Sequence, residues 1–223
     1  MSLDKLTKQK ERAAAAGHEA ARAKSTFREY AEAIVMALLL ALFIRTFIVQ
    51  AFKIPSGSMI PTLLIGDHIL VNKLAYGIRI PFAEDYAIRY RMPQRGDVVV
   101  FIFPEDRSKD FIKRVIAVGG ETVEIRDKKV FVNGKPIDDP HAHFEGSEIP
   151  GAASLANQDE YGPKTVPENH VFVMGDNRDR SHDSRFWGFV NIDDIRGKAF
   201  LIYWSWDGSD RWVRWERIGD LIQ

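Results

Sequence analysis

The chain has 223 residues, 45% of them hydrophobic, which allows one domain with a real core plus a membrane anchor, or two small domains. Its 31 basic residues balance 31 acidic ones, so the net charge gives no support for a nucleic-acid-binding surface. Cysteine is absent, which excludes disulfides, thiolate zinc sites and cysteine nucleophiles.

The first fifty residues divide into a polar tail and an apolar segment. Residues 1–32 are polar and rich in alanine and basic side chains, and we predict a cytoplasmic tail. Residues 33–52 read AIVMALLLALFIRTFIVQAF, about the 20 residues that a transmembrane helix requires. The preceding basic residues favour a cytoplasmic N-terminus, with the rest of the chain outside the cytoplasm. A buried core helix and a cleaved signal peptide are the alternatives, because Val49-Gln50-Ala51 loosely matches a small-x-small cleavage site.

Strand patterns dominate beyond residue 60, so residues 53–223 are predicted to form one β-rich domain. Short apolar or alternating runs bounded by turn residues predict strands at 68–71, 98–103, 111–118, 121–125, 128–132, 170–174 and 198–206. Asn133-Gly134 is the clearest hairpin turn, and Gly119-Gly120 joins two of the strands. Residues 73–92 are predicted to form a long loop or hairpin. Residues 138–167, rich in glycine, proline and alanine, are predicted to form a surface insertion.

Four tryptophans lie near the C-terminus, at positions 204, 206, 212 and 215. Tryptophan is enriched where proteins meet the membrane–water interface. These side chains therefore either contact lipid or belong to the core, and the sequence leaves both interpretations open.

A serine-containing turn directly follows the apolar segment. Residues 54–62 read IPSGSMIPT, in which Pro55 and Pro61 each fix φ and remove a backbone donor. Gly57 permits a backbone conformation that a side chain would resist, so the adjacent serine is presented outward. An ordinary linker turn uses the same residue types and is the alternative.

A serine hydroxyl needs a base to act as a nucleophile, and histidine is the common choice. The candidates are His68, His170 and His182, and the neighbouring Asp183 suggests a Ser-His-Asp arrangement. Adjacent residues on a strand point to opposite sides, however, which argues against that arrangement.

Lys113 is the other candidate base. On a strand it shares its face with Phe111 and Val115, whereas Arg114 points the other way. Burial on such an apolar face lowers the pKa of a lysine into the range of a general base. The alternative is a lysine on an edge strand with its ammonium group in water.

Four segments read IPSGSMIPTL, RGDVVVF, KRVIAVGG and MGDNRDRSHDSR, in that order after the apolar segment. Together they resemble the conserved boxes of bacterial type I signal peptidase, or leader peptidase, over about residues 33–205. The resemblance is to the single-span type. It implies a mainly β fold, with a single N-terminal transmembrane helix followed by an antiparallel β-sheet catalytic domain. It also implies a membrane-bound serine endopeptidase that removes signal peptides after a small-x-small motif.

The resemblance also implies roles for particular residues. Ser58 matches the nucleophile and Lys113 the general base of a Ser-Lys dyad. Ser56 matches the hydroxyl that, with the backbone N–H of Ser58, forms the oxyanion hole.

Three further residues match supporting positions of the family. Ser181 matches the hydroxyl that orients the lysine amine, and Asp183 and Arg185 match a supporting ion pair. One departure concerns the turn after the lysine strand, where residues 117–121 read AVGGE in place of the usual Leu-Pro-Gly-Asp. It weakens the expectation for that turn and leaves the expectation for Lys113 intact.

The implied partners are signal peptides of exported preproteins, the lipid bilayer and, in passing, the secretion machinery, but no nucleic acid. The implied location is the inner (cytoplasmic) membrane. No cofactor or metal is expected, and the loop histidines His141 and His143 are weak evidence for a metal. Two other functions stay open: a different Ser-Lys peptidase of the self-cleaving repressor type, and a non-catalytic, membrane-tethered β-domain that binds exported chains.

Overall fold

The computed structural model describes residues 27–79, 86–145 and 159–223, and the chain divides into two compact units, Met1–Arg45 and Thr46–Gln223. The described part of the first unit is helical and belongs to the helix Phe27–Phe47, which continues two residues into the second unit. The helix is 21 residues long, apolar and unburied, so its length and composition are sufficient to cross a bilayer. Most of the predicted tail, residues 1–26, lies outside the described residues, and its remaining residues, 27–32, belong to the helix, which therefore begins earlier than predicted.

The predicted span of residues 33–52 is wrong at its C-terminal end. The helix ends at Phe47, and Val49–Lys53 form strand β1, antiparallel to β2 (Asp67–Asn72). Phe52 packs against a core cluster, whereas Ala51 and Lys53 on either side of it are exposed. Hydropathy alone could not detect this change, because pairing with β2 satisfies the backbone groups that a helix would otherwise bond internally. The Val49-Gln50-Ala51 tripeptide therefore lies inside a paired strand.

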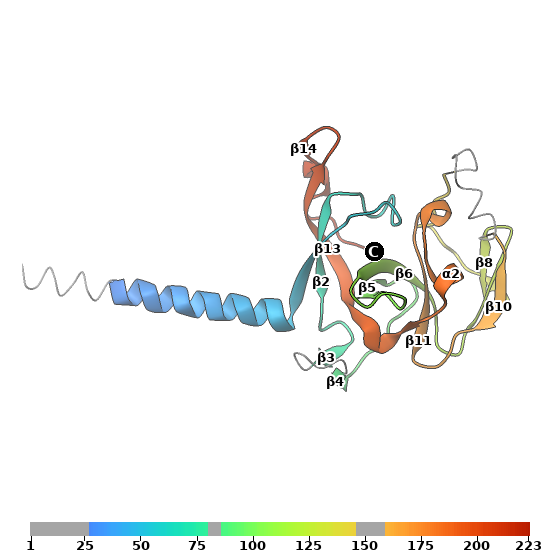
Figure 1. Cartoon of the computed structure of the whole chain (residues 1–223), viewed down its shortest axis with the longest axis horizontal. Helices are drawn as coiled ribbons and strands as arrows, with labels where there is room; N and C mark the ends of the chain where they lie inside the picture. The colour runs from blue at the N-terminus through green and yellow to red at the C-terminus, as the bar shows by residue number, and fades with distance from the viewer. Residues whose placement is uncertain (1–26, 80–85, 146–158) are drawn as a thin grey trace, which may run out of the picture. The chain divides into compact units, whose positions relative to one another are not determined.

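An 8-stranded antiparallel sheet forms the centre of the second unit (Figure 1). Its order is β1-β2-β13-β5-β6-β11-β12, with β14 paired to β13. The other strands of this sheet are β5 (Val98–Ile102), β6 (Asp110–Val118), β11 (His170–Met174), β12 (Val190–Asn191), β13 (Ile195–Asp207) and β14 (Trp212–Val213). The mainly β, antiparallel fold that was predicted is therefore confirmed.

A 4-stranded sheet has the order β10-β7-β8-β9, from β7 (Thr122–Arg126), β8 (Lys129–Val132), β9 (Lys135–Pro136) and β10 (Tyr161–Thr165). Asn133 and Gly134 have positive φ and turn the chain between β8 and β9, as the sequence predicts. Strands β6 and β7, which Gly119-Gly120 join, belong to different sheets. The predicted insertion at 138–167 includes a paired strand, β10, and its residues 146–158 lie outside the described part.

The remaining elements are short. Strands β3 (Gly77–Arg79) and β4 (Tyr86–Arg89) form a hairpin within the predicted loop at 73–92, of which residues 80–85 are outside the described range. The short helices are η2 (Arg178–Arg180), α2 (Ser184–Trp187), η3 (Ile192–Asp194) and η4 (Trp215–Arg217). The four C-terminal tryptophans are on the surface rather than in the core, with exposed fractions from 36% to 67%.

Strand β6 contributes to all three clusters of the hydrophobic core. Ile112 packs on the first cluster, Val115 belongs to the second, against which Phe111 packs, and Ile116 and Ala117 belong to the third. Polar side chains are nevertheless buried around this strand and after β11: Ser58, Lys113, Arg114, Asp176, Asn177, Ser181 and Asp183. Buried polar groups are costly unless they are paired, so their concentration here marks the candidate site.

Candidate active site

Ser58 lies on a loop of residues 54–67, here called the serine loop, whose two ends are joined. The Ile54 N–H donates to the Asp67 carbonyl at 2.8 Å, and the Gly66 N–H donates to the Ile54 carbonyl at 3.0 Å. Met59 and Leu63 are completely buried and attach the loop to the first core cluster. The serine is therefore on a packed structure rather than on a flexible linker.

Lys113 extends from β6 to this serine. Its Nζ lies 2.7 Å from Ser58 Oγ and also donates to the Ile112 carbonyl at 2.9 Å. The lysine is only 4% exposed, and its Nζ lies 5.5 Å from the centroid of the Phe111 ring. The structure thus brings the two residues of the predicted dyad into direct hydrogen-bonding contact, although they are 55 positions apart in the chain.

Burial lowers the pKa of Lys113 from 10.5 to about 8. The negative charges of Asp183 and Asp176 oppose this effect, and the positive charge of Arg185 adds to it. A substantial fraction of the amine is therefore neutral slightly above neutral pH. A neutral amine in contact with a serine hydroxyl can accept its proton, so this pair can generate a nucleophile.

Ser181, Asp183 and Arg185 form a buried layer beside the pair. Asp183 is fully buried, and Arg185 donates to its two carboxylate oxygens at 2.8 and 2.9 Å. Burial alone would raise the pKa of Asp183, but the charge and hydrogen bonds of Arg185 lower it, so the carboxylate stays ionised. Ser181 Oγ accepts a hydrogen bond from the Gly175 N–H at 3.1 Å and bonds to Asp183. Among the described residues, Lys113 bonds to Ser58 and Ile112 rather than to Ser181.

A second buried ion pair was missed by the sequence analysis. Arg114 donates to both carboxylate oxygens of Asp176, at 2.8 and 2.7 Å. Thr62 of the serine loop donates to the same carboxylate at 2.5 Å. This network connects β6, the serine loop and the segment after β11. Arg114 itself could have predicted this ion pair from the sequence, because an arginine on a buried strand requires an acidic partner.

Gly175 is required by the close approach of the chain on either side of it. A Cβ at this position would lie 2.4 Å from the Ser58 carbonyl oxygen and 2.3 Å from Ser181 Oγ. The Asn177 N–H donates to the same Ser58 carbonyl at 3.1 Å. Gly57, for which a special conformation was predicted, does not have a positive φ, and a Cβ there would meet only the side chains of Ile60 and Ile65.

A cleft of about 340 Å³ opens above the pair. The cleft is lined by Pro55, Ser56, Ser58, residues 110–113, Arg180 and His182, of which Pro55, Phe111 and Ile112 are apolar. Ser56 is exposed in this cleft. Within the described part of the chain, the Ser58 N–H makes no hydrogen bond, so it is free to bind an oxygen atom. The cleft therefore combines an apolar wall with free donors beside the serine hydroxyl.

Residues 27–204 match the protein-family description "Signal peptidase, peptidase S26". The chain belongs to this family. It is 39% identical to signal peptidase I of Pseudomonas fluorescens over 207 residues, which covers 80% of this chain and 72% of that protein. It is also 39% identical to signal peptidase I of Aquifex aeolicus, covering 77% of this chain and 82% of that protein.

Membership of this family confirms the resemblance to bacterial type I signal peptidase and shows that the chain is a peptidase. Together with the apolar helix Phe27–Phe47, it indicates a membrane-anchored protein.

The alternative Ser-His-Asp arrangement does not form in this member of the signal peptidase family. The His182 ring is exposed and packs near Phe103 and Phe186, while the Asp183 carboxylate is occupied by Arg185. His68 and His170 each contact a nearby backbone carbonyl through Nδ1. Within residues 27–79, 86–145 and 159–223, no group of three or more metal-binding side chains gathers.

Proposed function

We propose that this chain is a membrane-bound endopeptidase that uses a Ser58–Lys113 dyad to remove N-terminal signal peptides from exported preproteins. The observation that carries the proposal is the 2.7 Å contact between Ser58 Oγ and a buried lysine amine beside an apolar cleft. Membership of the signal peptidase family supports the substrate class. The size and apolar wall of the cleft suit the small side chains of an Ala-x-Ala-like cleavage motif.

In the proposed mechanism, the neutral amine of Lys113 takes the proton from Ser58 as Oγ attacks the scissile carbonyl. The resulting oxyanion binds to the Ser58 N–H and the Ser56 hydroxyl, and loss of one such donor typically lowers the rate ~10²–10³-fold. The protonated lysine passes its proton to the leaving amine. Water activated by the same lysine then hydrolyses the acyl-enzyme and releases the signal peptide.

The buried layer behind the dyad has a supporting role in this proposal. The ionised Asp183 stabilises the ammonium that forms on Lys113 during attack, and Arg185 keeps this carboxylate charged and oriented. Ser181 supports the dyad from the serine side, because its hydroxyl accepts a hydrogen bond from the Gly175 N–H and Gly175 packs against the Ser58 carbonyl.

Location in the inner membrane, with a cytoplasmic N-terminus, completes the proposal. The substrate's signal peptide and the helix Phe27–Phe47 would then share one bilayer, which raises their effective concentration for each other. Contact with the secretion machinery would be transient, as the preprotein emerges.

Cleavage of a synthetic preprotein in detergent tests this function. Wild-type protein should cut after the small-x-small motif, and Ser58→Ala should lower kcat by about 10⁴-fold or more, as expected for removal of a nucleophile. Ser108→Ala, which removes an exposed serine hydroxyl, is the matched control and should cleave normally. A Ser58→Ala protein with full activity would exclude the dyad. Binding of the preprotein without cleavage by the wild type would instead favour the non-catalytic domain.

The pH dependence gives an independent prediction. Cleavage requires neutral Lys113, so kcat/KM should rise with pH and level off above the lysine pKa of about 8. Below that value, we expect about a tenfold fall for each pH unit, because the neutral fraction falls in proportion. Initial rates between about pH 6 and about pH 10 measure the profile. A rate that still climbs at about pH 10 would exclude Lys113 as the base.

A further inference from the structure

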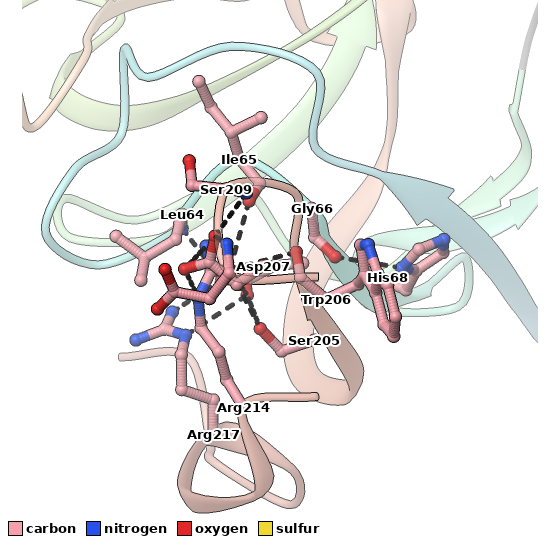
Figure 2. A network of polar contacts seen from close by, with 12 residues as sticks. Leu64, Ile65, Gly66, His68, Ser205, Trp206, Asp207, Ser209, Arg214 and Arg217 are labelled. Carbon is pink, nitrogen blue, oxygen red and sulfur yellow. Dashed lines mark hydrogen bonds and ion pairs between the residues drawn. The ribbon is translucent and has the colours of Figure 1, made fainter. Parts of the chain in front are cut away.

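Two arginines near the C-terminus bind backbone carbonyls of the serine loop. Arg217 Nη2 donates to the Thr62 carbonyl at 3.0 Å, and Arg214 Nη1 donates to the Ile65 carbonyl at 3.1 Å. Figure 2 shows both arginines beside the turn at Leu64 and Ile65. They belong to residues 205–217, here called the C-terminal segment, which starts directly after the region 27–204 that matches the family.

Asp67, at the end of the serine loop, is the common partner in this network. It is completely buried, and Arg217 donates to its two carboxylate oxygens at 3.2 and 2.6 Å. The Ser205 hydroxyl donates to it at 2.6 Å, and the Leu64 N–H at 2.8 Å. A carboxylate that accepts bonds from a guanidinium, a hydroxyl and a backbone amide fixes the direction of every donor. The arginine that binds it therefore has a fixed position relative to the loop.

The backbone of the C-terminal segment also contacts the serine loop directly. The Trp206 N–H donates to the Gly66 carbonyl at 3.1 Å. A Cβ on Gly66 would lie 2.1 Å from the Trp206 carbonyl oxygen, and Gly66 has a φ of +94°. Any larger residue here would separate the two segments. Arg214 is in turn held by Asp207, at 3.0 and 2.8 Å, so the segment has internal bonds as well.

The serine loop is thus held from two directions. Asn177 binds the Ser58 carbonyl from the segment after β11, and the C-terminal segment binds the second half of the loop at Thr62, Ile65 and Asp67. Because Ile54 joins the two ends of the loop by bonding to Asp67 and Gly66, movement of the second half changes the path of the whole loop. Displacement of a reacting group by about 1 Å can lower a rate by about 10²-fold.

We infer that Arg217, acting through Asp67 and the Thr62 carbonyl, is a positioning residue that holds Ser58 in register with Lys113. This inference rests on the proposed function for its kinetic consequence, whereas its structural consequence can be measured without activity. Arg217 does not line the cleft, and its bonds act on the loop that carries Ser58, so its effect should appear in kcat rather than in substrate binding.

Three full-length variants in detergent test the inference. Arg217→Ala removes the bonds to both Asp67 and the Thr62 carbonyl. Arg217→Lys keeps the positive charge but cannot form the bidentate contact with the Asp67 carboxylate. Glu216→Gln is the matched control, since it removes an exposed charge from the same 3₁₀ turn. Each is compared with wild type by hydrogen–deuterium exchange of peptides that cover residues 54–67 and of peptides from β6. The same samples are used to measure kcat and KM on a synthetic preprotein.

We expect Arg217→Ala to exchange about tenfold faster in the serine loop while β6 stays protected, because the loop locally loses its bonds to Arg217. Its kcat should fall about tenfold or more, with KM changed by less than about twofold. Arg217→Lys should be intermediate in both measurements, and Glu216→Gln should match wild type.

Unchanged loop exchange in Arg217→Ala would overturn the inference, as would an equal increase in β6, which would show a general stabilising role. A change confined to KM would also overturn it. If wild-type protein cleaves nothing, the proposed function fails, but the exchange of the serine loop still decides whether Arg217 positions it.

Discussion

Replacing Lys113 with methionine should remove most or all of the cleavage activity and at the same time stabilise the folded protein. Loss of a general base typically lowers a rate 10²–10⁴-fold. The stabilisation follows from the depressed pKa of Lys113, because the folded state disfavours a charge that the unfolded chain carries freely. Methionine has a similar length and no charge, so it can occupy the same buried space.

The sign and the pH range of this stability effect follow from linkage. The pKa of Lys113 is about 8 in the folded protein, whereas its ordinary value, taken for the unfolded chain, is 10.5. Between these two pH values the unfolded chain therefore binds more protons than the folded protein does. The wild-type free energy of unfolding is therefore lowered by roughly 3 kcal/mol below about pH 8, and this penalty disappears as the pH rises toward the unfolded pKa. The advantage of Lys113→Met should be largest near neutral pH and shrink in alkali.

Urea unfolding in detergent, followed by tryptophan fluorescence at two pH values, measures this difference. Lys129→Met removes an exposed lysine from a strand and is the matched control, for which a change within about 0.5 kcal/mol is expected. A marked loss of stability in Lys113→Met, or a gain that does not depend on pH, would contradict a neutral buried lysine.

The second large effect is expected for Asp183→Asn. This change leaves the buried guanidinium of Arg185 without its charged partner, and breaking such a pair typically costs about 3–5 kcal/mol. It also acts on Lys113, because the negative charge of Asp183 raises the lysine pKa whereas Arg185 lowers it. The midpoint of the pH–rate profile should therefore move below the wild-type value of about 8.

Rates and unfolding curves for Asp183→Asn, measured on the same preparation, separate the two effects. Asp210→Asn removes an exposed carboxylate and should change neither. The double variant Asp183→Asn/Arg185→Gln should recover part of the lost stability, since it no longer buries an unpaired charge. An upward shift of the midpoint would show that Asp183 does not interact with the lysine in the proposed manner.

Local patterns in the sequence were sufficient to predict most strands, the Asn133-Gly134 turn and the position of Lys113 on an apolar strand face. Alternation and turn chemistry act over a few residues, so they can be read directly from neighbouring positions. The four sequence boxes and their order also identified the family, which the comparison with known signal peptidases confirms.

The tertiary structure alone decided the features that depend on distant partners. The helix ends at Phe47 because the next residues pair with β2, and the 2.7 Å contact of Ser58 with Lys113 requires a loop and a strand that are 55 positions apart. The bonds of Arg217 to Asp67 span 150 positions. No periodicity encodes such contacts, because they exist only after the sheet has brought these segments together and excluded water from the charges between them.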